Sequence, residues 1–594
     1  MTRTPLRPLA RILSARAAGE NPNVIERENI RKRHEEMHDK MRQRAEGRLF
    51  LLGLCFFCAF VVVGGRMGAL ATSEPTEPRA SAPGATISAA RADIVDRDGR
   101  LLATNFETHA LYAQPPHMVD PEAAAEKLVQ IFPELKPERL IKDFTGTRKF
   151  VWIKRKISPE QMQAVHEIGD PGLLFGPRDM RLYPNGRLAS HILGGASFGK
   201  EGVSAAEVIG VAGVEKQFDD YLLDPANGNR PLELALDLPV QAAAERVLYG
   251  GMRLMNAKGA TAILMDVRTG EVVSLVSLPD FDPNNRPRPL TRGDQSESPL
   301  FNRAVQGVYE LGSTFKIFTA AQAIDLGIVN RNTVIDIRGP LQWGRFRIRD
   351  FRNYGKELTV ENIIVKSSNI GTARLAQRIG TPRQQDFLRD LGFFKPTKFE
   401  ILEASSGNPL LPRNWSELST MTISYGHGLS ASPMHLATAY AAIANGGYMV
   451  KPTILRQSGP RMGKRVLSEH SARVARQMLR KVVANGTASM GEVTGYSVGG
   501  KTGTADKPMP RGGYYEDKVI ATFASIFTAH DPQYVLVVTL DEPVETSGDE
   551  PRRTAGWTAV PVAAEMIKRI APLLGVRPGV EPAIRADITP ASSN

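Results

Sequence analysis

Cysteine is almost absent from this sequence: its 594 residues include only Cys55 and Cys58, which lie in one apolar run. Inside such a run the spacing Cys-Phe-Phe-Cys indicates packing rather than a redox site. The rest of the chain has no thiol for a disulfide or for a zinc site. The ten histidines show no metal-ligand spacing either. We therefore expect no bound metal, and a fold that is stabilised by apolar cores.

Long apolar runs are also scarce. Residues 49–65 contain no charge and approach the length that crosses a bilayer. Basic residues crowd before this run and are sparse after it, so the positive-inside rule places the N-terminus in the cytoplasm and exports the bulk of the chain. A cleaved signal peptide is the alternative, because Ala69-Leu70-Ala71 resembles a cleavage site. The preceding basic segment is, however, much longer than a signal peptide needs.

The excess of positive charge is largely local. The net charge is +12, and residues 1–48 alone hold 12 Lys and Arg against seven Asp and Glu. A basic segment beside an apolar run is typical of a membrane-proximal tail, so we expect no nucleic-acid partner. With 42% apolar and 23% charged residues, the chain is globular rather than disordered or polytopic.

The length predicts at least two folded units. A stretch rich in Pro, Ser and Thr follows the apolar run and indicates a linker, and the pattern of strands and helices changes near Leu232. The predicted segments are a cytoplasmic basic tail (1–48), a transmembrane anchor (49–71), a linker (72–90), a mixed α+β pedestal or dimerisation-type domain (91–231), an α/β domain (232–575) and a disordered tail (576–594).

Within the α/β domain, residues 261–278 predict two strands joined by a turn at Arg268-Thr269-Gly270. Further strands are predicted at 518–527 and 534–540, and a last helix near 560–574. Helical patterns fill the middle of the domain. A sheet that combines early and late strands around a helical middle has an α/β architecture.

The segment Ser313-Thr314-Phe315-Lys316 opens an apolar helical pattern. Residues three apart on a helix share one face, so Lys316 can reach the hydroxyl of Ser313. Serine is a weak nucleophile, and Lys316 can act as its base if burial or nearby positive charge lowers the lysine pKa. A helix start at Ser313 would also direct backbone N–H groups toward a reacting carbonyl. Alone, the pattern S-x-x-K is common on exposed helices.

A second motif, S-x-N, consists of Ser367 and Asn369. The serine can relay a proton, and the amide can hold a peptide carbonyl. Helix capping by polar residues explains the same segment equally well when it is taken alone.

A third motif is the glycine-containing strand Lys501-Thr502-Gly503-Thr504. Thr502 and Thr504 share one face of the strand and can bind a carboxylate, whereas Lys501 points elsewhere, toward Ser367. A glycine-rich hairpin is the alternative for this segment. Chance matches to all three motifs would, however, have to occur in the order S-x-x-K, S-x-N, K-T-G.

In this order the motifs resemble those of the penicillin-recognising serine acyltransferases, and among them the class B, monofunctional penicillin-binding proteins. The resemblance extends from Arg91 to Leu574. Arg91–Arg100, Arg181–Pro184 and Gly210–Glu215 are similar to motifs of the family's pedestal, with Ala92 where glycine is common. The resemblance implies an α/β transpeptidase domain of the penicillin-binding and β-lactamase-like fold, on a mixed α+β pedestal, with one N-terminal transmembrane helix.

The resemblance also implies an activity, that of a serine D,D-transpeptidase of the cell wall. Ser313 would attack a pentapeptide stem ending in D-Ala-D-Ala, an amine of a neighbouring stem would resolve the acyl-enzyme, and β-lactams would trap Ser313. The oxyanion hole would be the backbone N–H groups of Ser313 and Thr504, without a metal or an organic cofactor. The implied site residues are catalytic Ser313, Lys316 and Ser367 and substrate-binding Asn369, Lys501, Thr502, Gly503 and Thr504.

The overall resemblance is to the division-specific member of the family, with the elongation-specific relative as an alternative. The implied partners are the stems, β-lactam inhibitors, the membrane, and divisome proteins including a lipid II polymerase of the FtsW type. The implied location is the bacterial inner membrane, with the catalytic domain in the periplasm. Hydrolysis, as in carboxypeptidases and β-lactamases, is an enzymatic alternative, and a β-lactam sensor or divisome scaffold is a non-enzymatic one. His427 is interpreted as a turn residue rather than a base.

Overall fold

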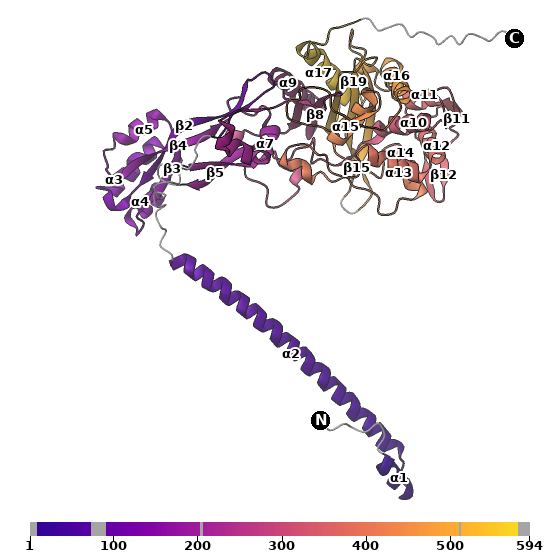
Figure 1. Ribbon diagram of the computed structural model, residues 1–594. Helices are drawn as coiled ribbons and strands as arrows, with labels where there is room; N and C mark the ends of the chain where they lie inside the picture. Colours follow the sequence, from indigo (N-terminus) through magenta and orange to yellow (C-terminus); the bar gives the residue numbers. More distant parts are fainter. Residues whose placement is uncertain (1–8, 73–90, 202–205, 510–511, 580–594) are drawn as a thin grey trace, which may run out of the picture. The chain divides into compact units, whose positions relative to one another are not determined.

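The computed structural model describes residues 9–72, 91–201, 206–509 and 512–579 (Figure 1). Residues 9–72 belong to one compact unit and residues 91–579 to another. Apart from Thr72, the predicted linker lies outside the described residues.

The N-terminal unit consists of α1 (Leu9–Ala17) and α2 (Asn23–Thr72), a helix of 50 residues. No proline interrupts α2, so one helix continues from the basic tail into the predicted anchor. Within it, Gly47–Gly65 has a mean hydropathy of 2.2 and no buried residue, and it is long and apolar enough to cross a membrane.

The pedestal is built on an antiparallel sheet in which the long strand β2 pairs with β1, β3 and β4, and β1 pairs in parallel with β7. Three helices, each beginning with proline at its first position, enclose a separate apolar core with these strands. The bounds are β1 (Ile94–Val95), β2 (Leu101–Ala113), α3 (Pro121–Ile131), α4 (Pro137–Thr145), β3 (Val151–Ile157), α5 (Pro159–His166), β4 (Leu173–Leu182), α6 (Ser190–Leu193), β5 (Gly195–Glu201), β6 (Ala206–Ala212), α7 (Gly213–Gln217), α8 (Asp219–Leu223) and β7 (Leu232–Glu233).

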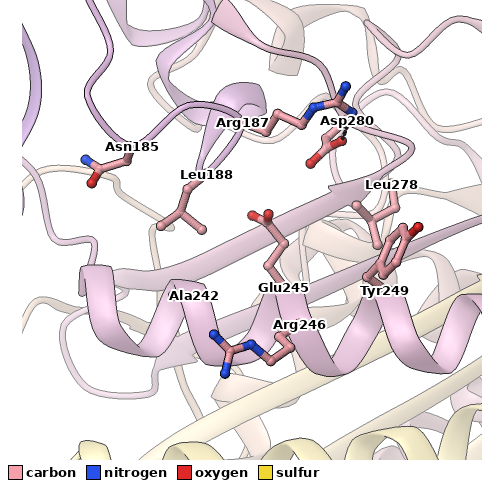
Figure 2. A pocket seen from close by; sticks show the side chains of 9 residues that line it. All are labelled: Asn185, Arg187, Leu188, Ala242, Glu245, Arg246, Tyr249, Leu278 and Asp280. Carbon is pink, nitrogen blue, oxygen red and sulfur yellow. Dashed lines mark hydrogen bonds and ion pairs between the residues drawn. The ribbon is translucent and has the colours of Figure 1, made fainter.

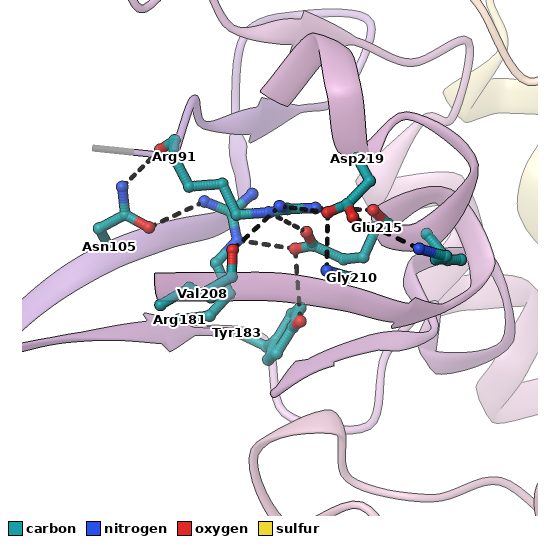
Figure 3. A network of polar contacts seen from close by, with 9 residues as sticks. Arg91, Asn105, Arg181, Tyr183, Val208, Gly210, Glu215 and Asp219 are labelled. Atoms are coloured by element: carbon teal, nitrogen blue, oxygen red, sulfur yellow. Dashed lines mark hydrogen bonds and ion pairs between the residues drawn. The ribbon is translucent and has the colours of Figure 1, made fainter. Parts of the chain in front are cut away.

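The three pedestal segments that carried the family resemblance meet at the buried carboxylate of Glu215 (Figure 3). Arg91 Nε donates to Glu215 Oε2 and Arg181 Nε donates to Oε1, both at 2.7 Å. Tyr183 also donates to Oε1, and Arg91 reaches Asp219 Oδ1 at 2.7 Å. Because a buried charge is costly without its partners, this network holds the start of the pedestal against segments over 100 residues later.

The α/β domain is organised around a five-stranded antiparallel sheet in the order β18-β19-β20-β8-β9. Strand β20 is buried at every position after its first, so both faces of the sheet are covered. The sheet confirms the predicted combination of early and late strands. Its bounds are β8 (Gly259–Asp266), β9 (Val272–Leu278), β18 (Gly499–Pro508), β19 (Tyr514–Phe527) and β20 (Tyr534–Asp541).

Helices α9 (Leu238–Leu254) and α17 (Ala559–Leu573) pack against each other and the sheet, while α15 (Pro433–Ala444) and α16 (Glu469–Asn485) pack on it from the helical middle. Helix α10 (Lys316–Asp325) lies inside this middle and is buried at every position except Asp325. The remaining elements are β10 (Tyr309–Glu310), β11 (Val334–Asp336), β12 (Leu341–Trp343), β13 (Phe346–Ile348), β14 (Glu357–Thr359), α11 (Val360–Lys366), α12 (Asn369–Ile379), α13 (Thr381–Asp390), α14 (Glu417–Ser424), β15 (Ser430–Ala431), β16 (Tyr448–Val450) and β17 (Met462–Arg465).

The predicted disordered tail begins too early. Val576 is buried and its N–H donates to Ala571 O at 3.0 Å, and the N–H of Gly579 donates to Gly495 O at 2.8 Å. The disordered tail is predicted from a Pro- and Ala-rich composition, and composition alone does not reveal contacts with distant segments. Residues 580–594 lie outside the described part of the chain.

Candidate active site

Ser313 lies in a single 3-10 turn, Gly312–Phe315, and α10 begins only at Lys316. This corrects the expectation that Ser313 begins the α-helix. Gly312 has a φ of +56°, a conformation that glycine adopts readily, and it turns the chain sharply before the serine. A 3-10 helix has three residues per turn, so Ser313 and Lys316 still share one face.

The turn is held from two sides. Tyr440 donates its hydroxyl proton to Thr314 O at 2.9 Å. A Cβ on Gly312 would lie only 2.8 Å from Thr504 O and 3.2 Å from Thr504 N, so this glycine allows the turn to approach β18 closely. A Cβ on Gly503 would meet Leu311 O in the same way. The backbones around Ser313 and Thr504 are therefore neighbours.

Lys316 is fully buried and directs its amine toward the S-x-N segment. Its Nζ lies 2.6 Å from Ser367 O, 2.6 Å from Asn369 Oδ1 and 3.1 Å from Ser367 Oγ. A neutral amine has two N–H donors, and here they can donate to Ser367 O and Asn369 Oδ1. Its lone pair then remains free to accept a proton from a hydroxyl. In the described part of the chain the Ser313 hydroxyl makes no hydrogen bond.

Lys501 approaches the hydroxyl of Ser367 from β18. Its Nζ lies 3.0 Å from Ser367 Oγ, the contact expected from the alternation of side chains along the strand. Ser367 ends α11 in the left-handed conformation with a φ of +63°, which is uncommon for a residue with a Cβ. This conformation positions its hydroxyl between the two lysine amines.

The two lysines titrate far from their usual range. Burial, and then the positive charge of Lys501, hold the pKa of Lys316 well below its ordinary value, although the carboxylate of Asp350 acts in the opposite direction. Burial lowers the pKa of Lys501 to about 7. Both causes favour the neutral amine of Lys316. This is the state that a general base requires.

Asp350 is a site residue that the sequence motifs did not indicate. Its Oδ1 accepts the N–H of Asn369 at 2.6 Å, and its Oδ2 accepts the hydroxyl of Ser368 at 2.7 Å. The amide of Asn369 is fixed in turn, since its Nδ2 donates to Arg349 O at 2.9 Å. Asp350 thus caps the start of α12 and orients the S-x-N segment. A lone acidic residue among arginines was its only sequence signal.

The two threonines of the K-T-G strand also have partners. Thr502 Oγ1 lies 2.8 Å from the hydroxyl of Thr487, and Thr504 Oγ1 accepts the N–H of Ala555 at 3.0 Å. The sequence motifs indicate neither Thr487 nor Ala555, because both residues lie outside the K-T-G segment. These contacts fix the hydroxyls on one edge of the site.

His427 lies beside the turn Gly312–Phe315, since the N–H of Gly312 donates to Gly426 O at 3.2 Å. It occupies the turn between Gly426 and Gly428, and its ring centroid is 6.4 Å from that of Tyr514. Its buried Nδ1 has no hydrogen-bond partner among the residues that the structure describes. Tyr514 donates instead to Glu310 Oε1 at 3.0 Å. These side chains form an aromatic wall next to the site.

A cavity of about 480 Å³ contains none of the predicted site residues (Figure 2). Glu245 projects into it from α9, facing Leu188 and Asp280. Burial, and then the negative charge of Asp280, raise the pKa of Glu245 to about 7. The cavity is lined by Asn185, Arg187, Leu188, Ala242, Glu245, Arg246, Tyr249, Leu278 and Asp280.

We expect the free energy of unfolding to fall as pH rises from 5 to 8, and Glu245→Gln to remove part of this fall. Between the ordinary glutamate pKa and about 7 the folded protein keeps a proton that the unfolded chain releases. This contribution is complete at acidic pH and is lost above 7. Urea unfolding at pH 5 and at pH 8 measures this fall in the free energy of unfolding. The fall should be smaller in Glu245→Gln than in wild type by roughly 2 kcal/mol. Equal pH dependence in the exposed control Glu126→Gln and in Glu245→Gln would contradict this assignment.

Two family models match the chain. Residues 260–567 match the penicillin binding protein transpeptidase domain, and residues 86–233 match the penicillin-binding protein dimerisation domain. The first match spans the K-T-G strand and the turn Gly312–Phe315, and the second spans the pedestal.

Curated relatives resemble the chain over most of its length. The probable peptidoglycan D,D-transpeptidase FtsI of Caulobacter vibrioides is 35% identical over 503 residues, which cover 83% of this chain and 82% of the relative. The peptidoglycan D,D-transpeptidase FtsI of Escherichia coli K12 is 28% identical, over 77% of this chain and 80% of the relative. A solved structure is also similar, the crystal structure of penicillin binding protein 3 from Mycobacterium tuberculosis complexed with aztreonam. Its sequence is 27% identical and the TM-score is 0.63, and the match covers 83% of this chain and 98% of the chain in that structure.

Proposed function

Because this chain belongs to the penicillin-binding protein transpeptidases, we propose that it is a peptidoglycan D,D-transpeptidase that acts through an acyl-enzyme on Ser313. The family resemblance, the fold class and the enzyme class predicted from the motifs are confirmed. Relatives named FtsI support a role in division rather than in elongation.

One observation carries the proposed mechanism: the Ser367 hydroxyl lies 3.1 Å from Lys316 Nζ and 3.0 Å from Lys501 Nζ. Neutral Lys316 takes the proton of Ser313 as Oγ bonds to the penultimate carbonyl carbon of the donor stem. The oxyanion is held by the N–H groups of Ser313 and Thr504. As the C–N bond to the terminal D-Ala breaks, Ser367 passes the proton from Lys316 to the leaving amine.

The second half of the reaction reverses these steps. An acceptor amine attacks the acyl carbon, a new C–N bond forms, and the ester bond to Ser313 Oγ breaks. The amine proton returns through Lys316 to the serine oxygen. Asn369 would hold a peptide carbonyl of the donor. Thr502 and Thr504 would bind its terminal carboxylate, and Lys501 would supply positive charge. Gly503 would allow η5, which is the turn Gly312–Phe315, to approach the strand.

Labelling with a fluorescent penicillin, followed by a turnover assay, tests this function. We expect stable covalent labelling, because a transpeptidase has no positioned water that releases the acyl group quickly. Rapid release would indicate a hydrolase of the carboxypeptidase or β-lactamase type. Stable labelling without any cross-linking of stems would indicate a β-lactam sensor or a scaffold.

We further propose that α2 anchors the enzyme in the inner membrane, with residues from Arg91 onward in the periplasm, near a lipid II polymerase of the FtsW type. The charge asymmetry around Gly47–Gly65 supports this orientation. Terminal sequencing of the membrane-extracted protein should find an intact N-terminus, and external protease should degrade the catalytic domain in spheroplasts. A mature chain starting near Thr72, or protection of that domain, would contradict this topology.

A further inference from the structure

A cationic segment borders the candidate active site. Residues 341–356, here called the basic hairpin, comprise the β12–β13 hairpin and the segment that follows it, and Asp350 is their only acidic residue. The five cationic residues are all exposed, and within the described part of the chain none of them forms an ion pair. They are Arg345, Arg347, Arg349, Arg352 and Lys356.

Large aromatic side chains accompany these cations. Phe351 is 79% exposed, Phe346 is 48% exposed and Trp343 is 36% exposed. The guanidinium of Arg345 lies 5.3 Å from the ring centroid of Phe346. Exposed aromatic residues together with arginine are typical of surfaces that bind a partner, because they combine apolar contact with anion recognition.

The basic hairpin is connected directly to the catalytic residues. Asn369 Nδ2 donates to Arg349 O, and Asn369 Oδ1 lies 2.6 Å from Lys316 Nζ. Asp350 accepts the N–H groups of Asn369 and Ile370 at 2.6 and 3.0 Å. The hairpin therefore lies on the S-x-N side of the site, two hydrogen bonds from the proposed base.

We infer that the basic hairpin binds the carboxylate-bearing acceptor stem, the second substrate of cross-linking. This inference rests on the proposed function, in which Thr502 and Thr504 already bind the carboxylate of the donor. A stem that ends in D-Ala-D-Ala carries a terminal carboxylate, which the unpaired arginines attract. The same positive field favours the neutral form of the acceptor amine, the form that attacks the acyl carbon.

The test uses the full-length protein with Arg345→Glu and Arg347→Glu combined. Arg345 lies in the exposed turn of the hairpin and Arg347 is an exposed residue of β13, and neither makes the contacts to Asn369. We expect the rate of penicillin acylation to change less than twofold. Transfer from a thioester donor to a soluble pentapeptide stem should fall about tenfold through a raised KM for the acceptor, and added salt should narrow the difference from wild type.

Two controls make the result specific. Arg253→Glu combined with Arg461→Glu reverses two exposed charges elsewhere on the domain, and should leave acceptor transfer unchanged. An acceptor stem with a C-terminal carboxamide lacks the terminal carboxylate, so wild type should use it as poorly as the hairpin variant uses the natural stem.

Unchanged transfer in the hairpin variant, or an equal loss of penicillin acylation and of transfer, would overturn the inference. In the first case the hairpin would serve another occupant, such as a protein partner, and in the second it would only support the site. Absence of penicillin labelling in wild type would instead contradict the proposed function itself.

Discussion

Replacement of Ser313 by alanine is expected to abolish covalent labelling by penicillin and to lower the acylation rate by roughly 10⁴-fold or more. The reaction needs an oxygen nucleophile at this position, and a methyl group cannot form the acyl bond. The variant should fold normally. Ser313 is half-buried, its hydroxyl makes no hydrogen bond within the described residues, and the glycine and tyrosine contacts that hold the turn do not involve it.

Fluorescent labelling on a gel and near-UV circular dichroism measure the two expectations separately. Ser458→Ala is the control, because Ser458 is an exposed serine whose hydroxyl makes no hydrogen bond in the described part of the chain. It should label normally. Retained labelling of Ser313→Ala with an intact fold would assign the nucleophile to another residue.

Replacement of Lys316 is expected to slow acylation by several orders of magnitude, about 10³-fold, both with alanine and with arginine. Alanine removes the base. Arginine keeps the positive charge but cannot lose its proton at any accessible pH, so it cannot accept the proton of Ser313. The position is fully buried and the amine contacts Ser367 and Asn369, so the larger guanidinium also lacks space.

The pH profile separates a base from a purely electrostatic role. In wild type the acylation rate should rise with pH through the lowered pKa of Lys316, because only the neutral amine accepts a proton. Both variants should lose this rise. Lys366→Arg, an exposed conservative change two residues before Ser368, is the control and should behave as wild type. Near-normal acylation by Lys316→Arg would show that Lys316 acts only through its charge.

The chemistry of the site could be predicted because each motif is local. Ser313 and Lys316 are three positions apart, and a helical or 3-10 turn places residues at this spacing on one face. Alternation along a strand likewise separates Lys501 from Thr502 and Thr504. The basic tail and the apolar run beside it are equally local, since they depend on composition over a few tens of residues.

Only the tertiary structure decided how these local pieces meet. Lys316 contacts Ser367 across a sequence separation of 51 residues, and Lys501 contacts it across 134. The periodicity of a helix or a strand does not relate residues at such separations. The role of Asp350 and the pKa of each lysine follow from burial and from neighbours brought by the packing of the whole domain. By itself the sequence determined which residue types could react. The enclosure of two lysine amines around one hydroxyl required the folded core, because only desolvation and fixed distances make a lysine neutral.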